Sequence, residues 1–295
     1  MPDTVSITAH AKANLFLRIL SREASGYHGI ETLFTLLELH DDITVARAAK
    51  GVLLEVDGAD TGPVEENLAY RAAAMVLDAT GKTFGVRMRL TKHIPVQAGL
   101  GGGSSDGAAV LHAVNRLAGD AVPRHEILQF AAKLGADVAF FASGAPLALA
   151  WGRGERLFRI PAPPAAPVLL AVPGEGVSTV EAYTQYDAVQ TNDARRGPVV
   201  LDADAFASWG GIGRLGGNDF ESVVFGRRPG LKTLFTRLCE TRPLLARLSG
   251  SGAAVIGIYK SERDRDGAAL EIGARHQRLI ETTTRQHPAP GPDAG

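Results

Sequence analysis

The stretch Pro95-Val96-Gln97-Ala98-Gly99-Leu100-Gly101-Gly102-Gly103-Ser104-Ser105-Asp106 decides how this chain of 295 residues is interpreted. It lies between a predicted strand and a run in which apolar residues recur at helical spacing. Consecutive glycines cost backbone entropy, but they let successive N–H groups approach a ligand closely. The serines begin the helix, whose N-terminus adds unsatisfied N–H groups and a partial positive charge. The pattern therefore predicts a polyphosphate site formed by Pro95, Gly99, Leu100, Gly101, Gly102, Gly103, Ser104 and Ser105.

The stretch does not match the other well-known glycine-rich nucleotide-binding loops. No lysine follows the last glycine, so the loop is not a Walker A loop. The strict G-x-G-x-x-G spacing is absent and no acidic residue ends a following strand, which excludes a Rossmann fingerprint. A flexible linker or a plain N-capped turn is the competing interpretation, but the loop has no linker-like repetition and directly precedes a strongly periodic helix. Because the loop carries no cation, any positive charge that neutralises a phosphate must come from elsewhere in the chain.

Composition and charge limit the class of protein. The hydrophobic share of 45% and the charged share of 21% are ordinary for a globular protein, and the length accommodates two domains. A formal net charge of −1 gives no field that attracts nucleic acid or an anionic membrane. The sequence contains one cysteine, Cys239, so no intrachain disulfide forms. With no signal-peptide pattern and no apolar run near the ~20 residues that span a bilayer, we expect a cytoplasmic protein.

Outward from the loop, the chain alternates short strands with helices. Asn67 is predicted to cap an alanine-rich helix that ends near Gly81, and another helix is predicted to begin at Pro123. Because strands and helices follow no strict βαβ rhythm, we expect an α+β fold. Strands are predicted near the N-terminus and at 43–47, 52–56, 86–90, 147–151, 156–160, 168–172 and 253–259.

A proline- and alanine-rich segment, residues 161–167, is the predicted connection between two domains. We expect an N-terminal domain over residues 1–160, which contains the glycine-rich loop, and a C-terminal domain over residues 161–286. The tail, residues 287–295, is rich in proline, glycine and alanine and is expected to be disordered.

Three motifs in sequence order resemble those of the GHMP kinases, a family named for galacto-, homoserine, mevalonate and phosphomevalonate kinases. The stretch from Pro95 to Asp106 resembles the phosphate-binding signature P-x-x-x-G-L-G-G-G-S-S-D. Ala11-Lys12-Ala13-Asn14-Leu15 resembles the first motif, and Leu248-Ser249-Gly250-Ser251-Gly252 resembles the third, a turn that closes over the nucleotide. The resemblance implies a two-domain fold with the active site in the cleft between the domains. It also implies transfer of the γ-phosphoryl group of ATP, bound with Mg²⁺, to an alcohol.

Three further stretches resemble the family members that phosphorylate the 2-hydroxyl of a cytidyl diphosphate sugar alcohol for isoprenoid synthesis. A cytosine ring needs both stacking and hydrogen bonds at its edge. The resemblance implies that His28 reads this edge and that Tyr27 and a second aromatic residue, for which Tyr183 is the candidate, cover the ring. The competing interpretations are a surface-packed tyrosine and a loop histidine bonded to backbone. The stretches are Ser25-Gly26-Tyr27-His28-Gly29-Ile30, Leu134-Gly135-Ala136-Asp137-Val138 and Gly217-Asn218-Asp219-Phe220-Glu221.

Lys12 and Asp137 are the predicted catalytic pair. Asp137 follows a predicted helix end, where a carboxylate can face a cleft and accept the proton of an alcohol, although such an aspartate is also a common N-cap. Lys12 precedes a strand that is predicted to be buried, where a lysine is unusual unless it is paired. The alternative is a solvated lysine at a sheet edge. The resemblance implies that Asp137 is the general base and that Lys12 keeps it ionised while offsetting the charge of the phosphoryl group.

Two asparagines complete the predicted site. Asn14 is expected to bind polar groups of the substrate and Asn67 to contribute to the nucleotide site. No carboxylate cluster identifies ligands for Mg²⁺, so no metal-binding residue is predicted. Three positions depart from the family pattern without removing a reactive group: His10, Gln97 and Ala139 replace a proline, a small residue and a proline.

Three other functions compete with this interpretation. A GHMP kinase of the homoserine or mevalonate type needs no Tyr27-His28 segment, because its substrate has no nucleobase. A catalytically silent nucleotide-binding protein of this fold would be expected to lack Lys12 or Asp137, and both are present. A nucleic-acid-binding module does not fit the near-neutral charge. We expect a small-molecule substrate, no nucleic-acid or membrane partner, and a monomer or homodimer.

Overall fold

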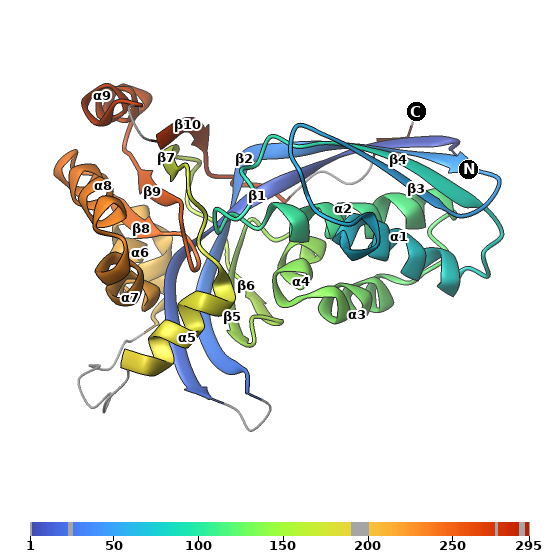
Figure 1. Ribbon diagram of the computed structural model, residues 1–295, viewed down its shortest axis with the longest axis horizontal. Coiled ribbons are helices and arrows are strands. Elements are labelled where there is room, and N and C mark those ends of the chain that lie inside the picture. Colours follow the sequence, from blue (N-terminus) through green and yellow to red (C-terminus); the bar gives the residue numbers. More distant parts are fainter. Residues whose placement is uncertain (1, 23–25, 190–200, 275–276, 289–292, 295) are drawn as a thin grey trace.

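The computed structural model describes residues 2–22, 26–189, 201–274, 277–288 and 293–294 (Figure 1). Strands and helices are mixed along the chain, which confirms the α+β prediction. The strands are β1 (Thr4–Arg22), β2 (His28–Ala48), β3 (Val52–Asp57), β4 (Gly85–Thr91), β5 (Leu147–Gly152), β6 (Arg156–Arg159), β7 (Pro167–Pro173), β8 (Leu245–Leu248), β9 (Val255–Ile258), β10 (Gln277–Thr283) and β11 (Asp293–Ala294). The helices are α1 (Leu68–Ala79), α2 (Gly102–Leu117), α3 (Arg124–Leu134), α4 (Ala136–Ser143), α5 (Thr179–Val189), α6 (Trp209–Gly213), α7 (Phe220–Arg227), α8 (Pro229–Glu240) and α9 (Glu262–Ile272), with short 3₁₀ turns at Val64–Glu66 and Ala203–Ala207.

The long antiparallel pair of β1 and β2 forms the centre of the larger sheet. This sheet has the order β11-β1-β2-β4-β3, in which β4 pairs with residues 42–48 of β2, and β5 pairs with residues 30–35 of the same strand. Figure 1 shows α1 to α4 lying along one face of this sheet, while the β1–β2 pair continues down to the part of the molecule that contains α5. The smaller sheet has the order β10-β7-β9-β8. The long pair therefore connects both halves of the molecule.

Within the described part of the chain, the buried apolar side chains form three clusters. The first fills the space between the larger sheet and α1 to α4. The second lies between the sheets and joins Ala11 and Phe16 of β1 to Val168 and Ile256 of the smaller sheet. The third packs α5, α7, α8 and α9 onto the smaller sheet and includes Leu17 of β1. Since β1 contributes to the second and third clusters, its motif is fixed between the two halves of the chain.

Several local predictions are confirmed. Asn67 caps α1 through a hydrogen bond to the N–H of Ala69, and β4 alternates between buried and exposed residues. Residues 161–167 run from beyond the end of β6 to the first residue of β7, and their part as a connection between domains stays a prediction. The division into domains at residues 1–160 and 161–286 stays a prediction.

Within the predicted disordered tail, residues 289–292 and 295 lie outside the described residues, whereas Asp293–Ala294 form β11 beside β1. That pairing was not predicted. Among the helices that the structure describes, none has the length and apolar character needed to cross a bilayer.

Candidate active site

The three sequence motifs meet at Ser249. Its hydroxyl donates to the carbonyl of Gly99 at 2.9 Å and accepts from the backbone N–H of Asn14 at 3.4 Å. A backbone hydrogen bond from Lys12 to the carbonyl of Leu100, 2.9 Å long, joins the first motif to the second directly. Ser249 is fully buried. Motifs that are far apart in the sequence therefore form one junction between the halves of the molecule.

Glycine is required in the loop for two different reasons. Gly99 has φ +76°, and a Cβ on it would lie 2.1 Å from the carbonyl oxygen of Ser249. Gly101 has φ +73°, and its Cβ would lie 2.8 Å from the ring of Phe141. At Gly103, by contrast, a Cβ would meet nothing within 4 Å. Packing therefore explains Gly99 and Gly101, whereas the missing side chain of Gly103 leaves open space beside the N-terminus of α2.

A buried lysine lies directly beside this loop. Lys92 Nζ donates to Asp106 Oδ2 at 2.7 Å and to the carboxylate of Asp41, and a Cβ on Gly102 would come within 3.1 Å of it. Burial lowers the pKa of Lys92, but the charges of Asp106 and Asp41 outweigh this effect and raise it. Burial raises the pKa of Asp106, whose Oδ1 is buried and has no hydrogen-bond partner among the described residues. Lys92 thus lies beside the loop as a cation whose charge is offset by the two carboxylates that it contacts.

A cavity of about 450 Å³, which we call the glycine-loop cavity, has residues 99–104 in its wall. Its other lining residues include Lys12, Asn67, Lys92, Asp137 and Tyr183. Asn67 Oδ1 caps α1, and its Nδ2 donates to the hydroxyl of Thr61 at 3.2 Å. The predicted part of Asn67 in nucleotide binding stays a prediction, although the residue lies on the wall of the expected cavity.

Lys12 and Asp137 meet at this cavity. Lys12 Nζ lies 3.5 Å from Asp137 Oδ2, and the two side chains are 4% and 34% exposed. Nζ also donates to Asn14 Oδ1 at 2.5 Å and lies 5.2 Å from the centre of the Phe34 ring. A solvated edge lysine is therefore excluded. Asn14 and the Phe34 ring therefore hold the ammonium in place. The carboxylate, in the first turn of α4, remains open to the cavity.

Asn14 holds this lysine instead of presenting a free amide. Its Oδ1 accepts from Lys12, and its Nδ2 donates to the hydroxyl of Thr32 at 2.8 Å. Thr32 in turn donates to the carbonyl of Phe16 at 2.6 Å. As placed, Asn14 orients Lys12. A substrate contact of Asn14 stays a prediction.

The predicted aromatic residues lie at a second cavity of about 1000 Å³, which we call the aromatic cavity and which is lined by Tyr27, His28, Arg153 and Tyr183 among others. The ring of His28 stacks on Tyr183 with centroids 5.0 Å apart and planes 13° apart. Tyr27 is 60% exposed, and the Arg153 guanidinium covers its ring at 4.2 Å. Ser25, which begins the segment singled out in the sequence, lies outside the described residues.

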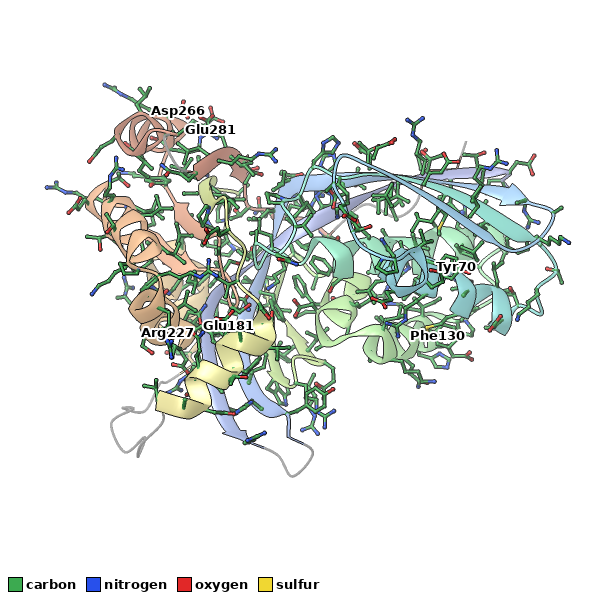
Figure 2. All side chains as sticks on the ribbon, in the orientation of Figure 1. Tyr70, Phe130, Glu181, Arg227, Asp266 and Glu281 are labelled. Atoms are coloured by element: carbon green, nitrogen blue, oxygen red, sulfur yellow. The ribbon has the colours of Figure 1, made fainter. Side chains whose placement is uncertain are left out.

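The two cavities adjoin at Asp137 and Tyr183. Thr179 and Tyr183 line both, and Asp137 in the wall of the first directly follows Gly135 and Ala136 in the wall of the second. Burial, and then the charge of Asp137, raise the pKa of Tyr183 to about 12, so its hydroxyl stays protonated at neutral pH. Tyr183 belongs to α5, which Figure 2 marks by Glu181 and which runs beside the β1–β2 pair.

The Gly217-to-Glu221 segment supports the third motif. Asn218 Nδ2 donates to the carbonyls of Leu248 (2.8 Å) and Gly250 (2.6 Å), and Glu221 accepts from the N–H of Leu248 at 3.0 Å. Asp219 accepts from the N–H of Ile19 at 2.6 Å. These contacts position the glycine-rich turn and the end of β1.

Three residues at the site were missed by the sequence analysis: Thr32, Lys92 and Asp187. Thr32 is one of many inward-facing positions of a long strand, and strand alternation does not distinguish it from an apolar neighbour. Lys92 stands where the β4 alternation ends, yet the sequence carries no signal that joins it to Asp41 and Asp106. Asp187, which accepts from His28 Nε2 at 2.7 Å, lies 159 residues away along the chain.

His10, one of the departures from the family pattern, is a buried and fully bonded histidine. Its Nδ1 lies 3.0 Å from the carbonyl of Leu37 and therefore carries the proton, while Nε2 lies 3.2 Å from both Arg285 Nη1 and the Thr8 hydroxyl. Burial, and then the charges of Arg285 and His40, lower the pKa of His10 to about 4.

This low pKa predicts a stability that depends on pH. Between pH 6.5 and about 4 the unfolded chain binds a proton at position 10 that the folded protein does not, so the free energy of unfolding falls as pH falls through this window. His10→Asn retains an N–H donor for Leu37. It is expected to reduce the loss of unfolding free energy between neutral and acidic pH by up to about 3 kcal/mol. Urea unfolding at pH 7 and pH 4.5 measures this difference in stability, and His125→Asn, a change at an exposed histidine, is the control. An equal loss in wild type and His10→Asn contradicts the prediction.

Comparison with known proteins gives consistent matches. The GHMP kinases N terminal domain matches residues 67–145. The 4-diphosphocytidyl-2-C-methyl-D-erythritol kinase of Prosthecochloris aestuarii is 33% identical over 93% of this chain and 96% of its own length. A crystal structure of 4-(cytidine 5'-diphospho)-2C-methyl-D-erythritol kinase superposes with a TM-score of 0.80 at 35% identity, covering 94% of this chain and 98% of that one. Homoserine kinase from Cytophaga hutchinsonii gives 0.70 at 18% identity, with 99% and 98% covered, which is a likeness of fold alone.

Proposed function

The chain belongs to the 4-diphosphocytidyl-2-C-methyl-D-erythritol kinases of the GHMP superfamily, and we propose how its residues carry out that reaction. The γ-phosphoryl group of ATP is transferred to the 2-hydroxyl of 4-diphosphocytidyl-2-C-methyl-D-erythritol, giving ADP and the 2-phosphate. The observation that carries the assignment of residues is the Lys12–Asp137 ion pair, 3.5 Å long, at the point where the glycine-loop cavity and the aromatic cavity adjoin. A donor and an acceptor bound in these two cavities would meet at that pair.

The glycine-loop cavity is the proposed site of the triphosphate. The backbone N–H groups at the start of α2 and the partial positive charge of its N-terminus favour an anion there. Lys92 lies at the first turn of the same helix, and the open space at Gly103 leaves room for phosphate oxygens. The adenosine would then extend along the wall that includes Asn67.

Mg²⁺ is proposed to enter with the nucleotide. The described residues contain no group of three or more histidine, cysteine or acidic side chains able to hold a metal. That donor set fits an ion that keeps water and phosphate oxygens as ligands, and the hydroxyl of Ser104 on the cavity wall would complete its shell. When bound, the ion would neutralise charge on the β- and γ-phosphates.

The proposed chemical step uses the ion pair directly. The oxygen of the substrate 2-hydroxyl forms a bond to the γ-phosphorus, the bond from that phosphorus to the bridging oxygen breaks, and ADP leaves. Asp137 accepts the hydroxyl proton as this happens. Lys12, held in place by Asn14, pairs with the Asp137 carboxylate and offsets the negative charge that develops on the transferring group.

ADP release in a coupled assay tests this function. Wild-type protein with ATP and Mg²⁺ is expected to turn over 4-diphosphocytidyl-2-C-methyl-D-erythritol, and not homoserine or mevalonate. Turnover of homoserine or mevalonate instead would reject the aromatic cavity as a cytosine site while retaining the Lys12–Asp137 chemistry. ATP binding without turnover of any of the three would support a silent nucleotide-binding protein.

His28→Ala is expected to raise KM for the cytidyl substrate by about 10- to 100-fold, because it removes the hydrogen bond to the edge of the base and the ring that packs on Tyr183. KM for ATP should stay within about twofold, since His28 lines the aromatic cavity and not the glycine-loop cavity. Steady-state kinetics with each substrate varied in turn measures both values. Equal changes in the two constants would reject the assignment of His28 to cytosine.

A further inference from the structure

Asp187 is an acidic partner of His28 that the proposed mechanism does not use. It lies on α5, and its Oδ1 is 2.7 Å from Nε2 of His28, whose side chain is 7% exposed. The other carboxylate oxygen, Oδ2, lies 3.6 Å from Arg22 Nη1 at the end of β1. The stacking of His28 on Tyr183, four residues earlier on α5, fixes the ring from a second direction. One helix therefore determines both the plane and the rotation of the imidazole.

This contact determines which ring nitrogen carries the proton. An ionised carboxylate can only accept a hydrogen bond, so Nε2 must be the protonated nitrogen. In a neutral imidazole the remaining nitrogen, Nδ1, is then a bare acceptor. Among the residues that the structure describes, Nδ1 of His28 has no hydrogen-bond partner of its own. It is therefore available to a ligand in the aromatic cavity, whose wall includes His28.

We propose that Asp187 is a positioning residue that makes His28 an acceptor at Nδ1 and thereby selects cytosine against uracil. This inference rests on the proposed function, in which His28 meets the edge of the base. Cytosine presents an amino group, a donor, at its fourth ring position, whereas uracil presents a carbonyl oxygen, an acceptor, at the same place. A bare Nδ1 pairs with the amino group and faces the carbonyl as one acceptor against another. A site built for one hydrogen bond in this way rejects the analogue that cannot make it.

The direct test reads the protonated nitrogen of His28 in the free protein. Nitrogen-15 NMR of histidine-labelled protein at pH 8.5, with His28 assigned by comparison with His28→Ala, is expected to show Nε2–H and a bare Nδ1. Finding the proton on Nδ1 would overturn the inference whatever the enzyme phosphorylates. Because this measurement needs no substrate, its failure is distinct from a failure of the proposed function, which would appear as no turnover of the cytidyl substrate by wild type.

The kinetic test compares the cytidyl substrate with its uridyl counterpart. Asp187→Leu removes the acceptor and is expected to lower the cytidyl-to-uridyl ratio of kcat/KM by about 10- to 100-fold, with KM for ATP unchanged. Asp187→Asn retains an acceptor oxygen for Nε2 and should restore most of the ratio. Glu181→Gln, a change on the same helix away from the cavity, is the control (Figure 2). An unchanged ratio in folded Asp187→Leu, or loss of activity with both bases alike in both Asp187 variants, would reject the proposal and leave Asp187 a purely structural contact.

Discussion

Asp137→Asn is expected to lower kcat by about 10²- to 10⁴-fold while leaving the Kd for ATP within about threefold. Asparagine has the size of aspartate but does not accept a proton at neutral pH, so the alcohol loses its base. Geometry should survive, because the side chain lies in the first turn of α4, is one-third exposed and pairs with Lys12 at 3.5 Å. The nucleotide is proposed to bind mainly through the start of α2, which this change does not touch.

Single-turnover kinetics and calorimetric titration of ATP separate the two effects of Asp137→Asn. Asp78→Asn makes the same chemical change at an exposed aspartate of α1, which pairs with Lys82, and it should leave both constants unchanged. A kcat within tenfold of wild type would reject Asp137 as the base. A proportionate loss of ATP binding would instead assign the carboxylate to the donor site.

The local features of the site were predictable because each depends on neighbours in the sequence. The glycine loop followed by a periodic helix identifies the start of α2, since glycine and helix N-termini act over a few residues. The resemblance of the motif around Lys12 predicted a paired lysine, and a buried Lys12 beside Asp137 is what the structure contains. The α+β class followed from the same local patterns.

What could not be predicted depends on contacts between distant segments. The Lys12–Asn14–Thr32 chain of hydrogen bonds depends on the register of β1 against β2, which no local pattern specifies. Lys92 is joined to Asp41 across the paired strands and to Asp106 across the start of α2. The pairing of His28 with Asp187 depends on where α5 packs. Composition and periodicity carry no information about any of these three arrangements.

The junction of the motifs predicts a second large effect, at Gly99. Gly99→Ala is expected to lower the free energy of unfolding by about 3 kcal/mol or more and to weaken ATP binding. Its φ of +76° disfavours any L side chain by about 1–2 kcal/mol, and the added Cβ would lie 2.1 Å from the carbonyl oxygen of Ser249. That oxygen belongs to backbone, so no change of side-chain rotamer relieves the clash. The loop and the third motif must separate, which also breaks the 2.9 Å bond from the Ser249 hydroxyl.

Gly103→Ala, the same substitution four residues later, distinguishes stability from ligand binding. A Cβ on Gly103 meets nothing within 4 Å and lies within α2, where alanine is favoured over glycine by about 1 kcal/mol, so the folded protein should be as stable as wild type or more so. ATP binding should still weaken, because the methyl group occupies space that the phosphates are proposed to use. Urea unfolding and ATP titration of both variants measure the stability and the ATP affinity of each one separately. If Gly103→Ala bound ATP as wild type does, the open space at Gly103 would not be part of the nucleotide site. If Gly99→Ala were as stable as wild type, the contact with Ser249 would not hold the motifs together.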